Sequence, residues 1–442
     1  MSFPRYPKYK DSGVEWLGEV PEHWEAKPLK HLAEIDSCGS YGVEPEVAEV
    51  ILPVATTAQI DSDGRFAVDL MPQRGFSPSE VQRYGCSNGD ILVVKSSGSA
   101  TNIISGKAGL VDKNTPPFVF SNFLMRVRPV RELVLPIFLY FQLRSHLTRQ
   151  RVELMCSTTT YPNLQVGRYS SAPLPVPPLP EQTQIAAFLD RETAKIDELV
   201  AEQQRLMELL KEKRQAVISH AVTKGLNPDA PMKPSGIEWL GDVPAHWGVS
   251  QSRRMFAVRS EPALATDRIL TASQKYGVLF QSDFVEIEGR RVAEVIKGVE
   301  NLKHVEPDDF IISMRSFQGG IEWCKLCGST SFHYVMIKPI KGVYPHFFSY
   351  LFKSATYIQA LRTTTDLIRD GQELRYSNFV QISLPVVPID EQANIAAFLD
   401  TETAKFDALT TEAQRAINLL QERRTALISA AVTGQIDVRA AL

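Results

Sequence analysis

Two blocks of this 442-residue sequence occur twice, and they frame two segments that do not repeat. The first block, SGVEWLGEVPEHW at Ser12–Trp24, returns as SGIEWLGDVPAHW at Ser235–Trp247. The second, EQTQIAAFLDRETAKID at Glu181–Asp197, returns as EQANIAAFLDTETAKFD at Glu391–Asp407. Similar frames around unlike segments suit one scaffold with two recognition elements, because the frame stays constant while each insert changes what it touches. The repeat therefore predicts recognition of a two-part target.

The length agrees with this layout, because each half of the chain is long enough to bury a core of its own. We call the first repeated block the cassette and each segment that does not repeat an insert. The sequence predicts four parts: a cassette with the first insert (1–180), a central helix (181–225), a second cassette with the second insert (226–390) and a C-terminal helix (391–442).

Membrane and secretion signals are not recognisable in the sequence. No run of about 18 apolar residues occurs, and the opening MSFPRYPKYK has no apolar stretch behind its basic residues. The five cysteines are few, odd in number and scattered, which is not the pattern of a disulfide framework. We therefore expect a cytoplasmic protein in a reducing compartment.

The net charge is close to neutral, with 48 Lys and Arg against 51 Asp and Glu. This total argues against a nucleic-acid partner, but the distribution of charge matters more. Residues 112–170 of the first insert hold eight basic and three acidic residues. A weakly basic insert on an acidic frame is consistent with DNA contact, although many ordinary domains are equally basic.

The second repeated block begins a helical pattern in which apolar residues recur at steps of three and four. In the first copy these are Ile185, Leu189, Ile196, Leu199, Leu206, Leu210 and Val217, and in the second Ile395, Leu399, Phe406, Leu409, Leu420 and Leu427. This stripe predicts two coiled-coil helices of about 40 residues, hence roughly 60 Å, with a possible restart at Asp190 or Thr193. We expect them to pair antiparallel and hold the inserts over DNA grooves, which repeat about every 34 to 36 Å. Packing into a globular core without a spacing role is the alternative.

Each insert carries a mixed pattern of strands and helices. Asp90–Lys95 (DILVVK) and Phe310–Met314 (FIISM) are short apolar runs that end in polar, glycine-bearing loops. Pro136–Arg149 and Pro345–Leu361 are helical stretches that precede threonine-rich loops. The expected fold class is α/β (α+β), with two distant copies of one domain and a pseudo-twofold repeat.

Three motifs resemble catalytic or metal sites and fail in detail. Asn114–Phe118 (NTPPF) is close to the tetrapeptide of amino-methyltransferases, but Thr115 stands where Asn, Asp or Ser is expected and no cofactor loop accompanies it. Gly98–Lys107 (GSATNIISGK) lacks the glycine spacing of a phosphate-binding loop. Cys324 and Cys327 form a lone CxxC, which His333 does not complete, so structural thiols are expected rather than a metal site.

The repeated blocks resemble those of the specificity subunits of type I restriction-modification systems. The resemblance covers essentially the whole chain, and its most specific parts are YPKYKDSGVEWLGEVPEHW, the two EQ blocks, ERRTALISAAVTGQID and, in the second insert, EPDDFIISMRSFQGGIE. It implies a non-catalytic subunit with two target recognition domains. Each domain would read half of a split, asymmetric site in double-stranded DNA, and the helices would set the spacer.

The same resemblance implies partners and cofactors. Two modification (methyltransferase) subunits would dock on the helices and bring S-adenosylmethionine, and restriction subunits would bring ATP with Mg²⁺. No cofactor is expected on this chain itself. Charged residues on the exposed face of the helices are the candidate docking positions: Glu198, Glu202, Arg205, Lys211, Glu412 and Arg415.

Candidate base-reading residues are polar loop residues that match the donors and acceptors of the major groove. In the first insert they are Lys95, Ser97, Asn102, Tyr161 and Asn163. In the second insert they are Lys275, Tyr276, Arg315, Ser316, Gln318, Thr364 and Arg369. For each of them a solvated loop position, or a phosphate contact without sequence information, is at least as good an explanation.

The repeated tryptophans Trp16, Trp24, Trp239 and Trp247 are expected to pack the cassettes on the helix ends, because a base-stacking element should differ where the targets differ. Two other functions remain open. The chain could be a structural adaptor whose inserts bind protein, in which case binding would respond little to salt, whereas DNA binding weakens steeply. An autonomous methyltransferase would have to bind S-adenosylmethionine by itself.

Overall fold

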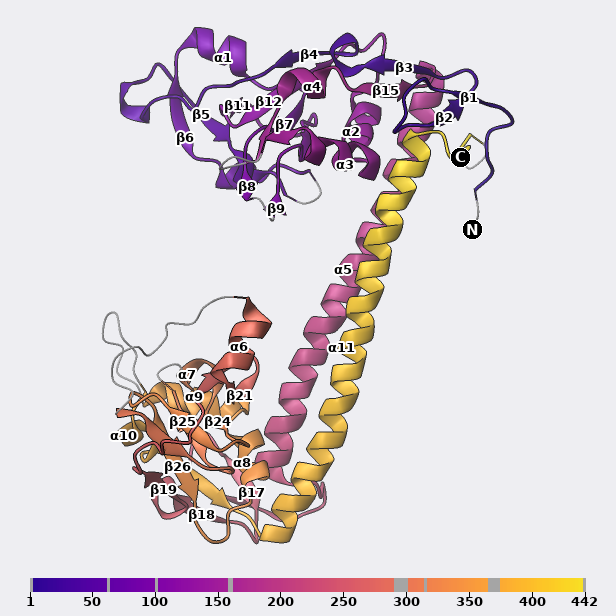
Figure 1. Cartoon of the computed structure of the whole chain (residues 1–442). Helices are drawn as coiled ribbons and strands as arrows, with labels where there is room; N and C mark the ends of the chain where they lie inside the picture. The colour runs from indigo at the N-terminus through magenta and orange to yellow at the C-terminus, as the bar shows by residue number, and fades with distance from the viewer. Residues whose placement is uncertain are drawn as a thin grey trace. The chain divides into compact units, whose positions relative to one another are not determined.

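The computed structural model describes residues 3–61, 64–99, 102–157, 162–289, 301–313, 316–364 and 374–439. The chain divides into two compact units. Unit 1 comprises Met1–Gln203 with Arg415–Leu442, and unit 2 comprises Gln204–Gln414. Figure 1 shows the elements of both units by colour along the chain.

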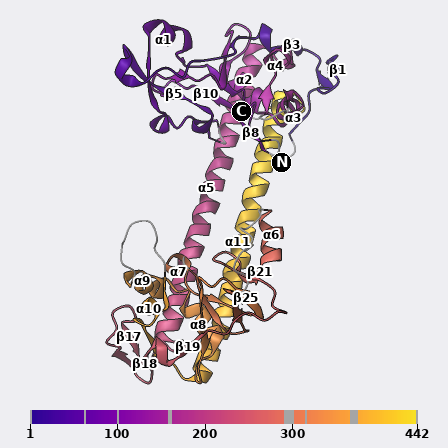
Figure 2. The same ribbon diagram turned by 60° about the vertical axis from the view of Figure 1, so that its left-hand side comes forward.

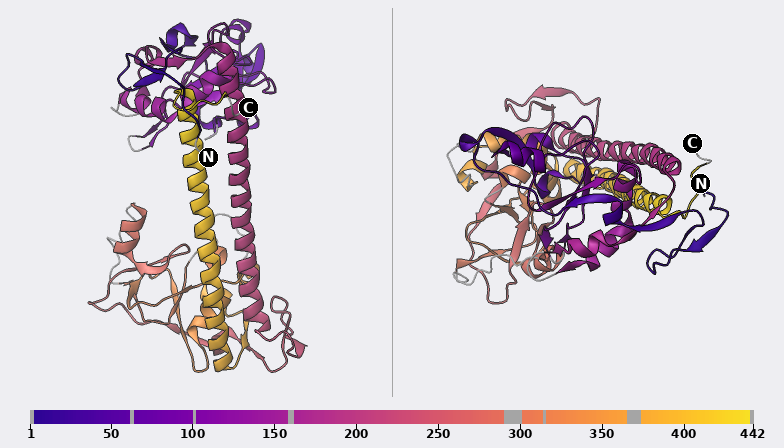
Figure 3. Two further views of the ribbon diagram at one scale, coloured as in Figure 1. Left: turned by 90° about the vertical axis from the view of Figure 1, so that its right-hand side faces the viewer. Right: turned by 90° about the horizontal axis from the view of Figure 1, so that it is seen from above.

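Two long helices dominate the described structure. Helix α5 spans Leu179–Lys224 and helix α11 spans Ile389–Val432. Neither is interrupted, so the restart considered at Asp190 or Thr193 does not occur. The Thr193 hydroxyl instead donates to the carbonyl of Asp190 inside the continuous helix, at 3.4 Å. Within each unit, segments of α5 and α11 lie side by side in opposite directions (Figure 3).

Ion pairs of equivalent residues join the two helices. In unit 1 Arg424 Nε donates to Asp197 Oδ1 at 2.9 Å, and in unit 2 Arg214 Nη1 donates to Asp407 Oδ1 at 2.7 Å. Asp197 and Asp407 are equivalent positions of the repeat, as are Arg214 and Arg424. The same antiparallel register is therefore present in both units.

The apolar stripe is buried in the first part of each helix, up to Ile196 in α5 and Phe406 in α11. Ile185 and Leu189 of α5, and Ile395 and Leu399 of α11, are completely buried. Further along, the stripe residues Leu199, Leu206 and Leu409 are 44%, 43% and 53% exposed. The two coiled-coil helices are as predicted, and their stripe is partly exposed to solvent in the middle. Near their starts the helices are covered by cassette and insert as well as by each other, whereas a helix pair alone covers little of either partner.

The first insert is built on a four-stranded antiparallel sheet with the order β10-β7-β12-β4. Its strands are β4 (Ala33–Asp36), β7 (Ile91–Val94), β10 (Ala108–Leu110) and β12 (Leu124–Pro129). Helices α2 (Pro136–Arg144) and α3 (His146–Leu154) follow the last of these strands. All four residues of β7 are buried, which explains the unbroken apolar run of the sequence.

A second, smaller sheet with the order β11-β5-β6 lies in the same insert. It consists of β5 (Val50–Ala55), β6 (Gln73–Phe76) and β11 (Val119–Phe120), and α1 (Pro78–Tyr84) follows β6. Ser77 caps α1, because its hydroxyl accepts from the Glu80 N–H while the Glu80 carboxylate accepts from the Ser77 N–H. Figure 2 shows this part of unit 1 from another side.

The second insert repeats the central sheet. Its order is β19-β26-β23-β24, formed by β19 (Phe256–Arg259), β23 (Phe310–Ile312), β24 (Glu322–Trp323) and β26 (Val335–Pro339). Helices α8 (Pro345–Leu351) and α9 (Ala355–Thr363) follow β26 as α2 and α3 follow β12. The fold class and the internal repeat are as predicted.

Outside this sheet the second insert differs from the first. It carries a hairpin of β20 (Leu270–Ser273) and β21 (Gly277–Phe280), and α6 (Gln281–Glu288) follows directly. It also pairs β22 (Lys303–Val305) with β25 (Gly328–Thr330). Unit 1 has counterparts of both, since β5 pairs antiparallel with β6 ahead of α1 and Gly85 forms a bridge with Val119 of β11, so the inserts differ in the length and position of these elements.

The cassettes fold alike in both units. Strands β1 (Tyr9–Asp11) and β2 (Glu19–Pro21) pair in unit 1, as β16 (Met232–Pro234) and β17 (Asp242–Pro244) do in unit 2. The start and end of each insert also pair with each other: β3 (Glu25–Pro28) with β15 (Pro173–Val176), and β18 (Gly248–Gln251) with β27 (Ser383–Val386). Each insert therefore leaves its frame through a two-stranded ribbon.

Candidate nucleic-acid interface

The EQ dipeptide at the start of each long helix fastens cassette and insert to that helix. The carboxylate of Glu181 accepts from the Trp24 indole at 3.1 Å and from the Tyr6 hydroxyl at 2.6 Å, and it contacts His23 Nε2 at 2.7 Å. Burial and the hydrogen bond to Glu181 raise the pKa of Tyr6. Trp24 is completely buried, so it packs the cassette as the sequence predicts.

The glutamine of the dipeptide points to the insert. Gln182 Oε1 accepts from the Leu135 N–H at 2.8 Å, and its Nε2 donates to the carbonyls of Leu133 and Pro177. In unit 2 Gln392 makes the equivalent bonds to Tyr344, Gly342 and Val387. Both glutamines are buried, so these bonds hold the start of α2 or α8 against the long helix.

Four of the candidate residues of the first insert gather where β7 ends. The Leu164 N–H donates to the Lys95 carbonyl at 2.8 Å, and Ser96 forms a β-bridge with Asn163. Asn102 lies on β9 (Asn102–Ile103), which pairs with β8 (Gly98–Ser99), and Asn163 lies on β14 (Asn163–Leu164). We call residues 95–99, 102–107 and 163–164 the first loop cluster. Asn102 and Asn163 are exposed, and Tyr161 is outside the described residues.

The backbone of the first loop cluster is tied to α3. Arg149 donates to the carbonyls of Ser105 at 2.6 Å and Ile103 at 3.2 Å. Gly98 and Gly106 have φ of +100° and +81°, and a Cβ at Gly106 would collide with Val152. Gly98 lies on β8 and Gly106 in the turn between β9 and β10, so the glycines that resemble those of a phosphate-binding loop have roles in the backbone of this insert.

Several basic residues of the first insert are engaged in its interior. Arg126 is 5% exposed and binds Asp36 at 2.6 Å, and Arg128 binds the buried Asp90 through two hydrogen bonds at 2.7 and 2.8 Å. The bond to Asp90 raises the pKa of Arg128. The local excess of basic residues therefore overstates the charge available to DNA, because these ion pairs depend on strand pairing that composition does not reveal.

A second group of candidates meets in the second insert. Lys275 and Tyr276 form the turn between β20 and β21, where the Tyr276 hydroxyl donates to Glu288 Oε1 at 3.0 Å. Contact with Tyr276 raises the pKa of Lys275. Gln318 is exposed on the short helix α7 (Ser316–Gly319), and a Cβ at Gly319 would touch the side chain of Gln274. We call residues 274–276, 318–319 and 362–364 the second loop cluster.

Thr364 belongs to the second loop cluster through its neighbour Arg362, whose Nη2 donates to the Gln318 carbonyl at 3.5 Å. The Thr364 hydroxyl donates to the Leu361 carbonyl at 2.8 Å at the end of α9. Arg315 and Arg369 are outside the described residues.

Ser316 does not fit the role predicted for it. Its side chain is completely buried, and its hydroxyl accepts from the Ser313 N–H at 2.9 Å. A hydroxyl in this position bonds the backbone just after β23 and does not face solvent. The sequence alone could not predict the burial of Ser316, because a serine after a strand is equally compatible with a cap and with an exposed loop.

The six candidate docking residues are all exposed: Glu198, Glu202, Arg205, Lys211, Glu412 and Arg415. The surface of the helices also carries exposed leucines, which the apolar periodicity of the sequence does not distinguish from buried ones. Leu199 and Leu409 are equivalent positions of the repeat, and so are Leu209 and Leu419, which are 52% and 57% exposed. Each unit thus presents one exposed leucine of each pair. The repeated sequence already showed that leucine occupies these positions in both copies.

The chain thus carries two inserts that share a central strand order and have different loop clusters, and each of the two long helices contributes to both units. Residues 21–208 match the family model described as "Type I restriction modification DNA specificity domain". The putative type I restriction enzyme MjaX specificity subunit of Methanocaldococcus jannaschii is 22% identical over 96% of this chain and 96% of that protein. The type I restriction enzyme EcoKI specificity subunit of Escherichia coli K12 is 20% identical over 96% and 91%.

The fold agrees with these matches. A solved chain from a study of the "structural basis underlying complex assembly and conformational transition of the type I R-M system" has a TM-score of 0.67 at 14% identity, covering 93% of this chain and 98% of that chain. The domain match and the full-length relatives support a type I restriction-modification specificity subunit. Among the described helices, none combines the length and apolarity needed to cross a membrane.

Proposed function

We propose that each insert of this specificity subunit reads one half of a split, asymmetric DNA site. The observation that carries the proposal is that two inserts with the same central strand order present different loop clusters. A common sheet holds the backbone of each cluster, while the exposed amides of Asn102, Asn163 and Gln318 differ in placement between the two. Amide side chains of this kind match the paired donor and acceptor of adenine in the major groove.

The long helices would set the number of base pairs between the two half-sites. Helix α5 has 46 residues, which corresponds to about 70 Å at 1.5 Å per residue. It is continuous and contributes residues to both units. Inserting seven residues into α5 after Gln203 and seven into α11 after Ala413 keeps the apolar phase, and it should lengthen the unread spacer without changing either half-site.

Catalysis would belong to the partner subunits. Two modification subunits would bring S-adenosylmethionine, and restriction subunits would bring ATP with Mg²⁺. The equivalent exposed leucines and the charged residues around them support two docking surfaces of the same kind, one in each unit. An aspartate in place of Leu209 or Leu419 should weaken the binding of one modification subunit and leave the other bound.

Single-base methylation mapping tests the proposed function. Cells would express this chain with its neighbouring modification and restriction genes, and we expect methylated adenine at a split motif. Asn163→Ala should relax one half-site and Gln318→Ala the other, while Asn114→Ala, which alters an exposed asparagine outside both loop clusters, should change neither. No methylation from a demonstrably active complex, together with DNA binding that is insensitive between 50 and 200 mM salt, would favour the protein-binding adaptor.

A further inference from the structure

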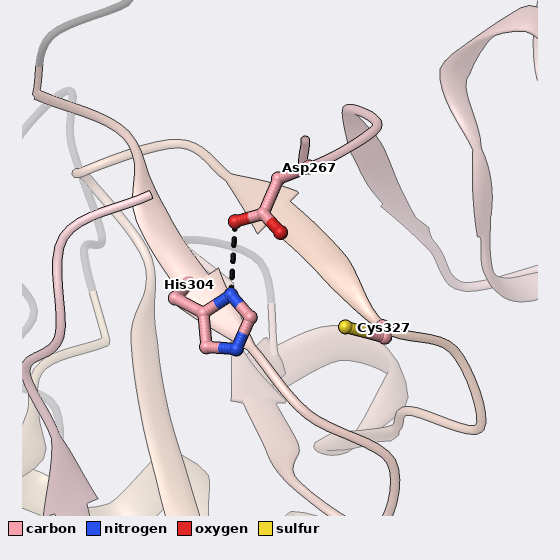
Figure 4. Close-up of side chains that lie close together, drawn as sticks. All are labelled: Asp267, His304 and Cys327. Carbon is pink, nitrogen blue, oxygen red and sulfur yellow. Dashed lines mark hydrogen bonds and ion pairs between the residues drawn. The ribbon is translucent and has the colours of Figure 1, made fainter. Parts of the chain in front are cut away.

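Three side chains of different metal-binding type converge in the second insert, away from the loop cluster residues. Asp267 lies in the loop before β20, His304 lies on β22, and Cys327 immediately precedes β25. One ligand atom of each lies within 4.8 Å of the other two. Figure 4 shows the carboxylate of Asp267, the imidazole of His304 and the sulfur of Cys327 directed toward one another.

The environment of His304 orients it for such a role. Its Nδ1 lies 2.9 Å from Asp267 Oδ2, and its Nε2 lies 2.8 Å from Glu306 Oε1. Zinc bonds to nitrogen and carboxylate oxygen are about 2.0 to 2.2 Å, so two neighbouring ligands of one ion are themselves roughly 3 Å apart. A carboxylate on the second ring nitrogen is the usual partner of a metal-binding histidine, because it fixes the tautomer.

Burial and access also suit an ion. The side chains of His304 and Asp267 are only 6% and 4% exposed, whereas Cys327 is exposed. Two protein ligands are therefore held rigidly, and the third leaves a path from solvent.

A protonated His304 held between two carboxylates is the simplest explanation without a metal. It accounts for Asp267 and Glu306, but it gives no reason for the sulfur of Cys327 to lie beside the same carboxylate and ring. Cys324, the other cysteine of the CxxC, is buried and its thiol contacts the Leu326 carbonyl at 3.1 Å. The two cysteines therefore have different environments, and the candidate site uses only one of them.

We propose that Asp267, His304 Nδ1 and Cys327 bind a zinc ion, with water as the fourth ligand and Glu306 orienting the imidazole. Cysteine with histidine and carboxylate is a donor set that favours Zn²⁺ over Mg²⁺ or Ca²⁺. On binding, the Cys327 thiol releases its proton to solvent and its sulfur bonds to the metal. The ion joins the loop before β20 to the β22–β25 pair, and it stabilises this side of the second insert. The inference does not depend on the proposed DNA target.

Metal content and cobalt spectroscopy of the purified full chain test the zinc site. We expect about one zinc per chain by elemental analysis, and a thiolate-to-cobalt charge-transfer band when Co²⁺ replaces zinc. Cys327→Ser should abolish the band, and Asp267→Asn should weaken binding at least tenfold. Cys38→Ser, which alters another exposed free cysteine, should leave both readouts unchanged.

A second readout is independent of metal analysis. Removing zinc with a chelator should increase amide hydrogen exchange in β22 and β25 of the wild-type chain. It should have no such effect on Cys327→Ser, in which the zinc site is already lost. Because Cys327 is exposed, this variant is expected to fold. Wild-type protein without stoichiometric zinc, or a charge-transfer band that survives in Cys327→Ser, would overturn the proposal.

Discussion

The two frames make nearly the same contacts, yet one of them is more deeply buried. Glu181 in unit 1 and Glu391 in unit 2 both accept a hydrogen bond from a cassette tryptophan and contact the histidine before it. The side chain of Glu181 is 8% exposed and also accepts from Tyr6, whereas that of Glu391 is 28% exposed. Repetition of sequence thus preserves the pattern of hydrogen bonds but not their burial, because the flanking segments differ.

In the two inserts, by contrast, equivalent carboxylates form ion pairs with arginines that lie on different strands of the sheet. Asp90 and Asp309 each precede the central strand, and each accepts from the backbone N–H three residues earlier. Asp90 is paired with Arg128 of β12, whereas Asp309 is paired with Arg259 of β19. A buried carboxylate needs a compensating charge, but the sheet allows that charge to come from the adjacent strand, as β12 is to β7, or from the strand beyond it, as β19 is to β23.

The largest difference between the inserts is expected at these arginines. Arg259→Met leaves Asp309 buried and unpaired, which should cost about 3 to 4 kcal/mol of the stability of unit 2. Arg128→Met should cost about 2 kcal/mol in unit 1, because the Arg128 side chain is 39% exposed against 15% for Arg259, so water can replace it. Denaturant-dependent hydrogen exchange in β7 and β23 measures both. Equal losses of stability in the two units would show that the exposure of the arginine does not decide how much its replacement costs.

The next largest effect is the difference in stability lost when the equivalent glutamates Glu181 and Glu391 are replaced. Glu181→Ala leaves the buried donors of Trp24 and Tyr6 unsatisfied, at about 1 to 3 kcal/mol each, so unit 1 should lose about 3 kcal/mol. Glu391→Ala should cost unit 2 about half as much. Hydrogen exchange of the cassette strands β1–β2 and β16–β17 is the measurement, and Glu198→Ala on the exposed helix surface is the control. A larger loss in unit 2 would contradict the comparison.

The pH dependence of two carboxylates should have opposite signs. Burial raises the pKa of Glu322 in unit 2, so its contribution to stability is complete below the unfolded pKa and is lost as pH rises through the folded pKa. Hydrogen bonds from Ser77 and Ser40 lower the pKa of Glu80 in unit 1, so its contribution is complete above the unfolded pKa and is lost as pH falls through the folded pKa.

Stability curves of the full chain from about pH 3 to pH 7, followed by hydrogen exchange in each unit, measure this difference. Glu322→Gln should remove the loss in unit 2 at the upper end, and Glu80→Gln should remove the loss in unit 1 at the lower end. A change of the same sign in both units would refute the assignment.

The smallest effect concerns the equivalent ion pairs between the helices. Double-mutant cycles should give a coupling of about 0.5 to 1 kcal/mol for Asp197 with Arg424, and less for Arg214 with Asp407, since exposed pairs contribute little. Arg424 is 15% exposed and Asp407 is 61% exposed. High salt should reduce the second coupling first.

The repeated blocks and the apolar periodicity predicted the frame well. The helices begin at Leu179 and Ile389, close to the start of each EQ block, and the central strands and following helices lie where the apolar runs indicated. Local patterns of this kind report which face of an element is buried, and they need no knowledge of distant residues. The candidate site was predictable only as a set of loops.

The sequence by itself determined the duplicated frame and the mixed fold of the inserts, because these follow from repeats and periodicities within short windows, and its repeated blocks carried the resemblance to specificity subunits. Only the tertiary structure decided that Ser316 is buried, that Arg126 and Arg128 are engaged in ion pairs, that Leu199 and Leu409 are exposed, and that Cys327 lies beside His304 and Asp267. Each of these depends on which strands and helices become neighbours, and strand pairing brings together residues whose separation along the chain carries no local signal.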